Sequence, residues 1–204
     1  MQARKIGLSI LFFILSVHVF GQLPGYSFYK ILTIQSSQVQ GPGNHLDFPV
    51  LIAHTDADLR YTGSGGDVQN INGWDIKFTA ADGITTLDHQ LELYTSTTGE
   101  LVAWVRVPSV SSTVNTDIRI YYGNASIIAD QSLSSTWNSK YKGVWHLHND
   151  ILDGTSNAHD MTNASTTNQA TCIAADGQDF TIGQSLTRAL DPTLQFTGDL
   201  TLEG

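Results

Sequence analysis

The alternation of apolar residues within residues 100–124 constrains the fold of this chain most strongly. Apolar side chains recur at every second position in residues 101–107, and the same period returns in residues 117–122. A period of two is the signature of a β-strand, because successive side chains point to opposite faces. Pro108 lacks a backbone N–H and is expected to end the first strand, and the polar residues 109–116 then turn the chain. The segment predicts two neighbouring strands of an all-β domain.

Several further segments carry strand patterns. Residues 28–34 are rich in β-forming residues, residues 48–53 are a continuous apolar run typical of a strand covered on both faces, and residues 74–78 alternate. Residues 125–133 are a candidate short helix. Short strands separated by Gly- and Asn-rich turns predict a β-sandwich of the jelly-roll kind. Its core is expected to contain Val105, Val107, Ile118 and Ile120.

The N-terminus has the three parts of a secretory signal. Arg4 and Lys5 precede an apolar run at residues 6–20, and Gly21 supplies a small residue before a cut at Gln22. The run is shorter than the about 20 residues that span a bilayer. We therefore predict a signal peptide at residues 1–21, an exported extracellular or surface protein, and no transmembrane anchor in the mature chain.

The charge of the chain is acidic. The formal net charge is −9, and removal of the two basic residues with the signal takes it to −11. A polyanion repels nucleic acid, so nucleic acid is not expected as a partner. The one cysteine, Cys172, allows no intramolecular disulfide, and its flanking residues favour a small buried side chain over a nucleophile.

The alternating segment also resembles a known family. The runs WVRVP at residues 104–108 and IRIYYGN at residues 118–124 are similar to the end of DUF2341, a bacterial domain of unknown function. Residues 26–34, 48–52, 73–79 and 87–92 resemble its earlier strands in the right order. The resemblance covers roughly residues 24–130 and implies a domain of secreted and cell-surface proteins, without an assigned activity.

A second resemblance begins further along. GVWHL at residues 143–147, DGTSN at residues 153–157 and residues 194–203 are similar to the opening of a laminin-G or concanavalin A-like lectin domain, although Ala158 replaces its usual glycine. The expected organisation is a sandwich at residues 22–133, a linker at residues 134–142 and an incomplete lectin-like second sandwich at residues 143–204. The chain would then be the N-terminal part of a longer protein.

Two sets of side chains are candidate binding sites. Trp74, Trp104 and Tyr121 could form a platform on which a sugar stacks, but aromatic residues at such positions also pack in cores or across strands. Asp153, Asn157 and Asp160 could bind Ca²⁺, as lectin-like domains often do, but they are equally typical of a surface turn.

Other side chains are weaker candidates. His146 and His148 have a metal-ligand spacing, or the former packs as part of the GVWHL pattern. Glu92 and Glu100 could be the carboxyl pair of a glycosidase, or exposed acids at strand ends. No fingerprint of a hydrolase, metalloprotease or nucleotide-binding enzyme occurs.

These observations together favour a non-catalytic, exported recognition or adhesion module, with binding of extracellular polysaccharide expected of the full-length protein. Two alternatives stay open: an accessory module of a secreted glycoside hydrolase or other hydrolase, and a structural spacer in a large surface adhesin.

Overall fold

A computed structural model describes residues 22–148, 150–169, 175–195 and 197–198 of the chain. The predicted signal peptide with Gly21, the cysteine Cys172 and most of the segment 194–203 lie outside the described residues. Within the described part, no helix has the length and apolar character needed to cross a membrane.

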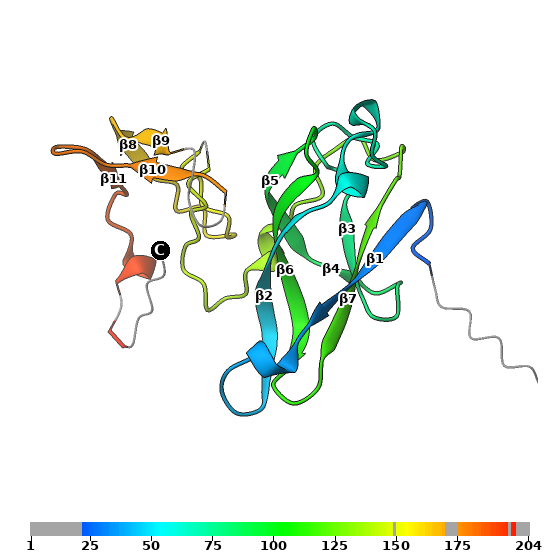
Figure 1. Ribbon diagram of the computed structural model, residues 1–204. Helices are drawn as coiled ribbons and strands as arrows, with labels where there is room; N and C mark the ends of the chain where they lie inside the picture. Colours follow the sequence, from blue (N-terminus) through cyan, green and yellow to red (C-terminus); the bar gives the residue numbers. More distant parts are fainter. Residues whose placement is uncertain (1–21, 149, 170–174, 196, 199–204) are drawn as a thin grey trace, which may run out of the picture.

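Two antiparallel sheets form a β-sandwich, which confirms the prediction of an all-β fold (Figure 1). One sheet has the order β1-β7-β3-β4, and the other has the order β2-β6-β5. The strands of the first are β1 (Phe28–Ile34), β7 (Thr116–Tyr122), β3 (Lys77–Ala80) and β4 (Thr86–Leu87). Those of the second are β2 (Asn44–Thr55), β6 (Glu100–Ser111) and β5 (His89–Thr95).

The core lies between the two sheets. The four predicted core residues are all buried there, with exposures of 2% or less: Val105, Val107, Ile118 and Ile120. Phe78 joins them from β3, Ile76 from the position just before that strand, and Leu59 from the connection between β2 and β3. The period of two therefore identified the inward faces of β6 and β7 correctly.

The expected pairing of β6 with β7 is wrong. β6 pairs with β2 and β5, whereas β7 pairs with β1 and β3, so the two consecutive strands lie in opposite sheets. The segment 87–92, expected from the resemblance to be one strand, is also divided, because Leu87 ends β4 in one sheet and His89 begins β5 in the other. A period of two indicates which face of a strand is buried, but it does not identify the strand that pairs with it.

Two details of the strands also differ from expectation. β6 continues through Pro108 to Ser111, because its pairing with β2 skips Pro108 and Asp47, where an N–H is not needed. Asp47 has a left-handed backbone, with φ 50°. β2 is an edge strand whose Phe48 and Leu51 are partly exposed, so its two faces are not both covered.

The connections contain single turns of 3-10 helix and no α-helix among the described residues. The predicted short helix at residues 125–133 is a turn followed by irregular chain. The 3-10 turns are η1 (Ser36–Gln38), η2 (Ala57–Leu59), η3 (Thr62–Ser64), η4 (Ser134–Thr136) and η5 (Pro192–Leu194).

The part of the chain after the sandwich forms two small two-stranded sheets. β8 (Thr162–Ala164) pairs with β11 (Ser185–Thr187), and β9 (Thr167–Gln169) pairs with β10 (Gly177–Asp179). Residues 143–147, which resemble the opening of a lectin-like domain, are irregular, and Leu147 has φ 60°. The expected linker at residues 134–142 is packed on the sandwich, because Trp137 is buried against Trp104.

Candidate functional site

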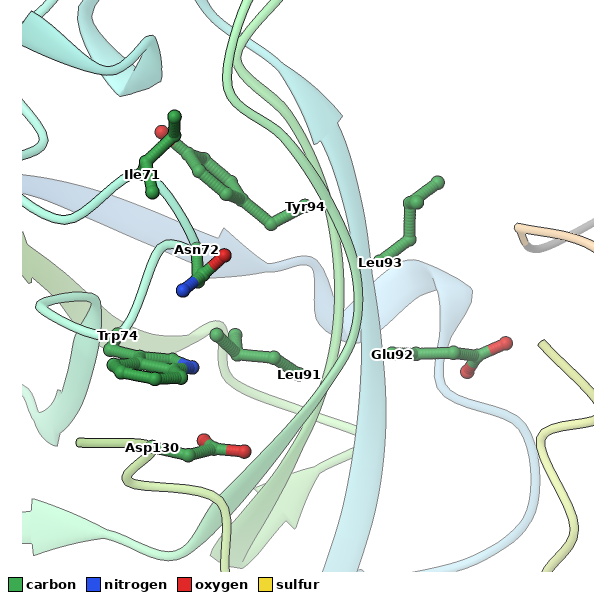
Figure 2. A pocket seen from close by; sticks show the side chains of 8 residues that line it. All are labelled: Ile71, Asn72, Trp74, Leu91, Glu92, Leu93, Tyr94 and Asp130. Atoms are coloured by element: carbon green, nitrogen blue, oxygen red, sulfur yellow. The ribbon is translucent and has the colours of Figure 1, made fainter. Parts of the chain in front are cut away.

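A shallow hollow of about 220 Å³ opens beside β5, between that strand and the loop that precedes β3 (Figure 2). The side chains of Trp74, Asn72, Leu91 and Asp130 converge on it, whereas the side chain of Glu92 points away to the other side of β5. The hollow is lined by Ile71, Asn72, Trp74, Leu91, Glu92, Leu93, Tyr94 and Asp130.

The loop that carries Trp74 is held by the next residue, Asp75. This carboxylate is completely buried. It accepts hydrogen bonds from two backbone N–H groups of its own loop, at 2.8 Å each, and from those of Gly123 and Asn124 after β7, at 3.0 and 3.2 Å. Because a buried carboxylate needs such donors, the four bonds fasten the loop to the end of β7 and fix the position of Trp74.

Gly73 lets this loop lie directly against Tyr94. Its φ is +74°, and a Cβ there would stand 2.7 Å from the ring of Tyr94. The Tyr94 hydroxyl donates to the carbonyl of Leu59 at 2.8 Å, and burial raises the pKa of this hydroxyl above its ordinary value. The ring is therefore anchored at both ends and forms a fixed wall of the hollow.

Some polar groups at the hollow make hydrogen bonds within the protein, and others make none. The Trp74 carbonyl accepts from Gln131 at 2.7 Å, and Asp130 Oδ1 accepts from the backbone N–H of Ser132 at 2.8 Å. Among the described residues, no hydrogen bond is made by the indole N–H of Trp74, the side-chain amide of Asn72 or Oδ2 of Asp130. An aromatic surface thus stands beside free donors and acceptors, as in sites for small polar ligands.

The three aromatic residues expected to form one platform are separated by the fold. Tyr121 is fully buried on β7, where it packs against Tyr26 and Tyr29. Trp104 is on β6 in the other sheet and is covered by Trp137, with ring centroids 5.2 Å apart. Only Trp74 lines the hollow, so the three-residue platform is wrong. Alternation could not reveal that distant chain segments, one earlier and one later, cover these side chains.

The two glutamates weighed as a glycosidase pair or as acids at strand ends have different surroundings. A β-bulge in β5 places Glu92 out of register between Leu91 and Leu93. Its carboxylate accepts from the indole N–H of Trp104 at 2.6 Å. Glu100 accepts from Thr95 Oγ1 at 3.2 Å across the hairpin. Each carboxylate is engaged in its own structural contact, and Glu92 does not point into the hollow.

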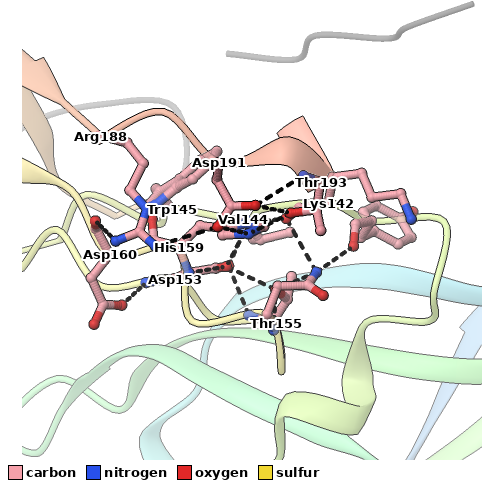
Figure 3. Close-up of polar contacts among 12 residues, drawn as sticks. Lys142, Val144, Trp145, Asp153, Thr155, His159, Asp160, Arg188, Asp191 and Thr193 are labelled. Carbon is pink, nitrogen blue, oxygen red and sulfur yellow. Dashed lines mark hydrogen bonds and ion pairs between the residues drawn. The ribbon is translucent and has the colours of Figure 1, made fainter. Parts of the chain in front are cut away.

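The candidate calcium ligands lie in a turn that is held by hydrogen bonds within the protein (Figure 3). The Asp153 carboxylate is fully buried and accepts three backbone N–H groups and the Thr155 hydroxyl, each at 2.9 Å. Burial raises the pKa of Asp153, but these hydrogen bonds outweigh it, so the pKa lies below its ordinary value. Asp160 accepts from the Asp153 N–H, and the Asn157 amide donates to backbone carbonyls. The Asp153 carboxylate and Asp160 Oδ1 are therefore already occupied within the turn.

The histidines likewise form separate contacts. His146 lies 3.1 Å from Glu92, and His148 lies 3.1 Å from Asp176. In the described ranges, no group of three His, Cys, Asp or Glu side chains is placed to hold a metal ion.

The comparisons with known proteins add one match to this antiparallel β-sandwich. The model of the family "Domain of unknown function (DUF2341)" matches residues 72–163. This range confirms the resemblance in part, but it begins later than the expected residue 24 and continues past residue 130 into the segment packed on the sandwich. No curated protein and no solved structure matches the chain. Neither comparison supports a lectin-like domain after the sandwich, which stays a prediction.

Asn72, Tyr94 and Asp130 were missed by the sequence reasoning. They lie in three different segments, and only the fold brings them to Trp74. The signal available in the sequence was the Gly73-Trp74 pair at the end of the loop between β2 and β3, since glycine allows a close approach of the backbone to its neighbours.

Proposed function

We propose that this chain is a non-catalytic, exported recognition module that binds glycans at the hollow beside β5. The observation that carries the proposal is the partly exposed indole of Trp74, held rigidly beside the free amide of Asn72 and the free carboxylate oxygen of Asp130. Export is supported by the charged and apolar pattern of residues 1–21.

The chemistry of the hollow suits a sugar ring. The C–H face of a pyranose can pack on the indole, while its hydroxyl groups exchange hydrogen bonds with the amide and the carboxylate. The small volume fits one or two rings at the end of a chain rather than a long polymer in a cleft. Asp130 and the net charge of −9 repel anionic sugars, so neutral polysaccharides are the expected ligands.

The test is titration of the protein with neutral and uronate-containing oligosaccharides. Wild type should bind a neutral member, and Trp74→Ala should weaken this binding at least about tenfold, because it removes both the stacking surface and a hydrogen-bond donor. Tyr29→Ala is the control, since Tyr29 is a partly exposed aromatic residue in the other sheet and its loss should leave the affinity unchanged.

Three results would count against the proposal. Wild type that binds no member of the panel would remove the glycan assignment. Equal affinities for wild type and Trp74→Ala would move the site away from the hollow. Release of shorter products from any oligosaccharide would show that the module is catalytic.

A further inference from the structure

We infer that the ligand of the hollow beside β5 is an N-acetylated amino sugar, whose acetamido group lies across the hollow between Asn72 and Asp130. The inference rests on the proposed glycan binding and names the chemical class of the ligand. It is carried by a carboxylate and an amide on opposite sides of the hollow, by an aliphatic side chain between them, and by the hydrogen bonds that fix the segments around them.

The carboxylate of Asp130 sets the first requirement on the ligand. Its Oδ1 accepts from the backbone N–H of Ser132 at 2.8 Å, while Oδ2 makes no hydrogen bond within the described part of the chain. An ionised carboxylate can only accept hydrogen bonds. The ligand must therefore present a donor on this side of the hollow, and it cannot be an anionic sugar without electrostatic repulsion.

The amide of Asn72 sets the second requirement. Asn72 and Asp130 stand on opposite sides of Trp74 and Leu91 in the close view (Figure 2). The backbone N–H of Asn72 donates to Asn70 Oδ1 at 2.9 Å, whereas its side-chain amide makes no hydrogen bond among the residues that the structure describes. This amide contains two N–H donors, so it is suited to a carbonyl oxygen of the ligand.

A secondary amide meets both requirements with one group. Its N–H and its C=O point in opposite directions, because the amide is planar and trans. An acetamido group that lies between the two side chains donates its N–H to Asp130 Oδ2, and its carbonyl oxygen accepts from Asn72. A single hydroxyl group has its donor and its acceptor on one atom and does not span two opposite sides in this way.

The aliphatic side chain between the two polar groups accounts for the methyl of the acetamido group. Leu91 is half-buried on β5 and points into the hollow. A sugar that carries only hydroxyl groups around its rim has no apolar substituent to place against this side chain. A methyl group that packs there leaves water, which favours binding of the acetylated sugar.

The segments that carry these groups are tied together within the protein. The backbone N–H of Leu91 donates to Ser132 Oγ at 3.0 Å, and Gln131 Nε2 donates to the carbonyl of Trp74 at 2.7 Å. The chain beside Asp130 is thus fastened to β5 and to the loop that carries the indole. Because little ordering is needed on binding, such a fixed set of contacts can discriminate between closely related ligands.

The first measurement compares trisaccharides that differ only in this group. The full chain is titrated calorimetrically with β-1,4-linked trisaccharides of N-acetylglucosamine and glucose, and with those of N-acetylgalactosamine and galactose. In the series that binds, the acetamido member should bind at least about tenfold more tightly than the hydroxyl member, because it gains two hydrogen bonds and a methyl contact. The free-amine form, which lacks the carbonyl and the methyl, should bind more weakly than the acetamido form.

The outcomes separate this inference from the proposed function. Equal affinities within each pair would overturn the acetamido assignment and leave glycan binding in place. Tightest binding of the free amine would make the hollow a site for cations and would overturn it as well. Binding of no member would remove the glycan site and the inference together.

Asp130→Asn tests the contact with the N–H of the ligand. The new amide oxygen can still accept from Ser132, so the turn is retained, but an N–H donor replaces the free oxygen. The preference for the acetamido sugar should fall at least about fivefold. Asp117→Asn is the matched control, because this exposed carboxylate on β7 accepts from Thr33 Oγ1 at 2.7 Å and does not line the hollow; it should keep the preference. An unchanged preference in Asp130→Asn would contradict the inference.

Saturation-transfer NMR tests where the methyl group lies. When the aliphatic protons of the protein are irradiated, the acetyl methyl of the bound sugar should receive the strongest transfer, because it packs on Leu91. Strongest transfer to the ring protons, with little at the methyl, would place the acetamido group in solvent and overturn the assignment.

Discussion

His89 is the side chain whose burial has the clearest consequence for the stability of the fold. It is fully buried, and its ring packs edge-on against Phe78 with centroids 5.3 Å apart. Burial lowers the pKa of His89 to about 4, with a further contribution from the positive charge of Lys77. The sandwich therefore contains a neutral imidazole that an unfolded chain would protonate more easily.

The first prediction is that the free energy of unfolding falls as the pH is lowered from about 6.5 to about 4. In this window His89 is protonated in the unfolded chain but not in the folded chain. Its contribution to the free energy of unfolding is therefore fully present above pH 6.5 and is lost as the pH falls toward 4. The loss attributable to His89 is about 3 kcal/mol. Urea denaturation at several pH values measures it.

His89→Leu is the variant that isolates this effect. Its absolute stability can change, but the part of the pH dependence between 6.5 and 4.5 should disappear. The aspartates with lowered pKa, such as Asp56 and Asp153, titrate mostly below that window. An unchanged slope in His89→Leu would mean that other groups cause the dependence.

At the level of single residues, the sequence predicted burial better than binding. Val105 and Ile118 were placed in the core from their period of two, since a strand face that is apolar throughout is expected to be buried. For Trp104 and Tyr121 the sequence left a sugar platform and packing within the fold as alternatives, and it could not choose between them because the residues that cover them, Trp137 and Tyr26, are distant in the chain. Trp74 lines a hollow, but the neighbours that form it could not be inferred from spacing.

The loop from Ile71 to Asp75 is the element on which the proposed site depends. Gly73→Ala should destabilise the protein by about 1–3 kcal/mol and weaken glycan binding. A methyl group there would be strained at φ +74° and would collide with Tyr94, so the loop carrying Trp74 must move. Urea denaturation and the glycan titration give the two readouts.

Gly43→Ala separates the two causes of this effect. Gly43 also has a positive φ, +83°, but a Cβ there meets nothing within 4 Å. It should lose stability through backbone strain alone and keep its affinity. Equal affinity in Gly73→Ala and wild type would show that the loop does not position the site.

At the level of elements, local patterns located the strands but not their partners. The polar residues 109–116 were sufficient to separate β6 from β7. The assignment of the two strands to opposite sheets depends on β1 and β2, which lie beside them. The partner of a strand is the segment that the rest of the fold places beside its edge. The residues within the strand say little about which segment that will be.

The whole molecule gives a prediction about domain limits. A fragment of residues 22–163 should be more stable than one of residues 22–133, because the longer fragment retains Trp137 on Trp104 and His146 on Glu92. The free energies of unfolding of the two fragments should differ by about 3–5 kcal/mol or more, which is what truncation of a buried tryptophan costs. The family match, which extends to residue 163, supports the same limit.

Urea denaturation of the two fragments, followed by far-ultraviolet circular dichroism, measures this difference. Both should give β-type spectra, since β1 to β7 are present in each. Equal midpoints would restore the boundary at residue 133 that the composition of residues 134–142 had indicated. The sequence could not reveal the docking, because polar residues around a single tryptophan resemble a linker.

The pairing of β1 with β7 joins the first strand of the sandwich to its last. Thr33 and Asp117 face each other in this ladder although 84 residues separate them in the chain. In a chain that emerges N-terminus first, the apolar strand β1 therefore stays unpaired until β7 emerges, when nearly the entire sandwich is already present. Such distant pairings also slow folding to milliseconds or seconds. For the export proposed above, this interval would leave the chain unfolded enough to pass through a translocation pore before β7 completes the sandwich.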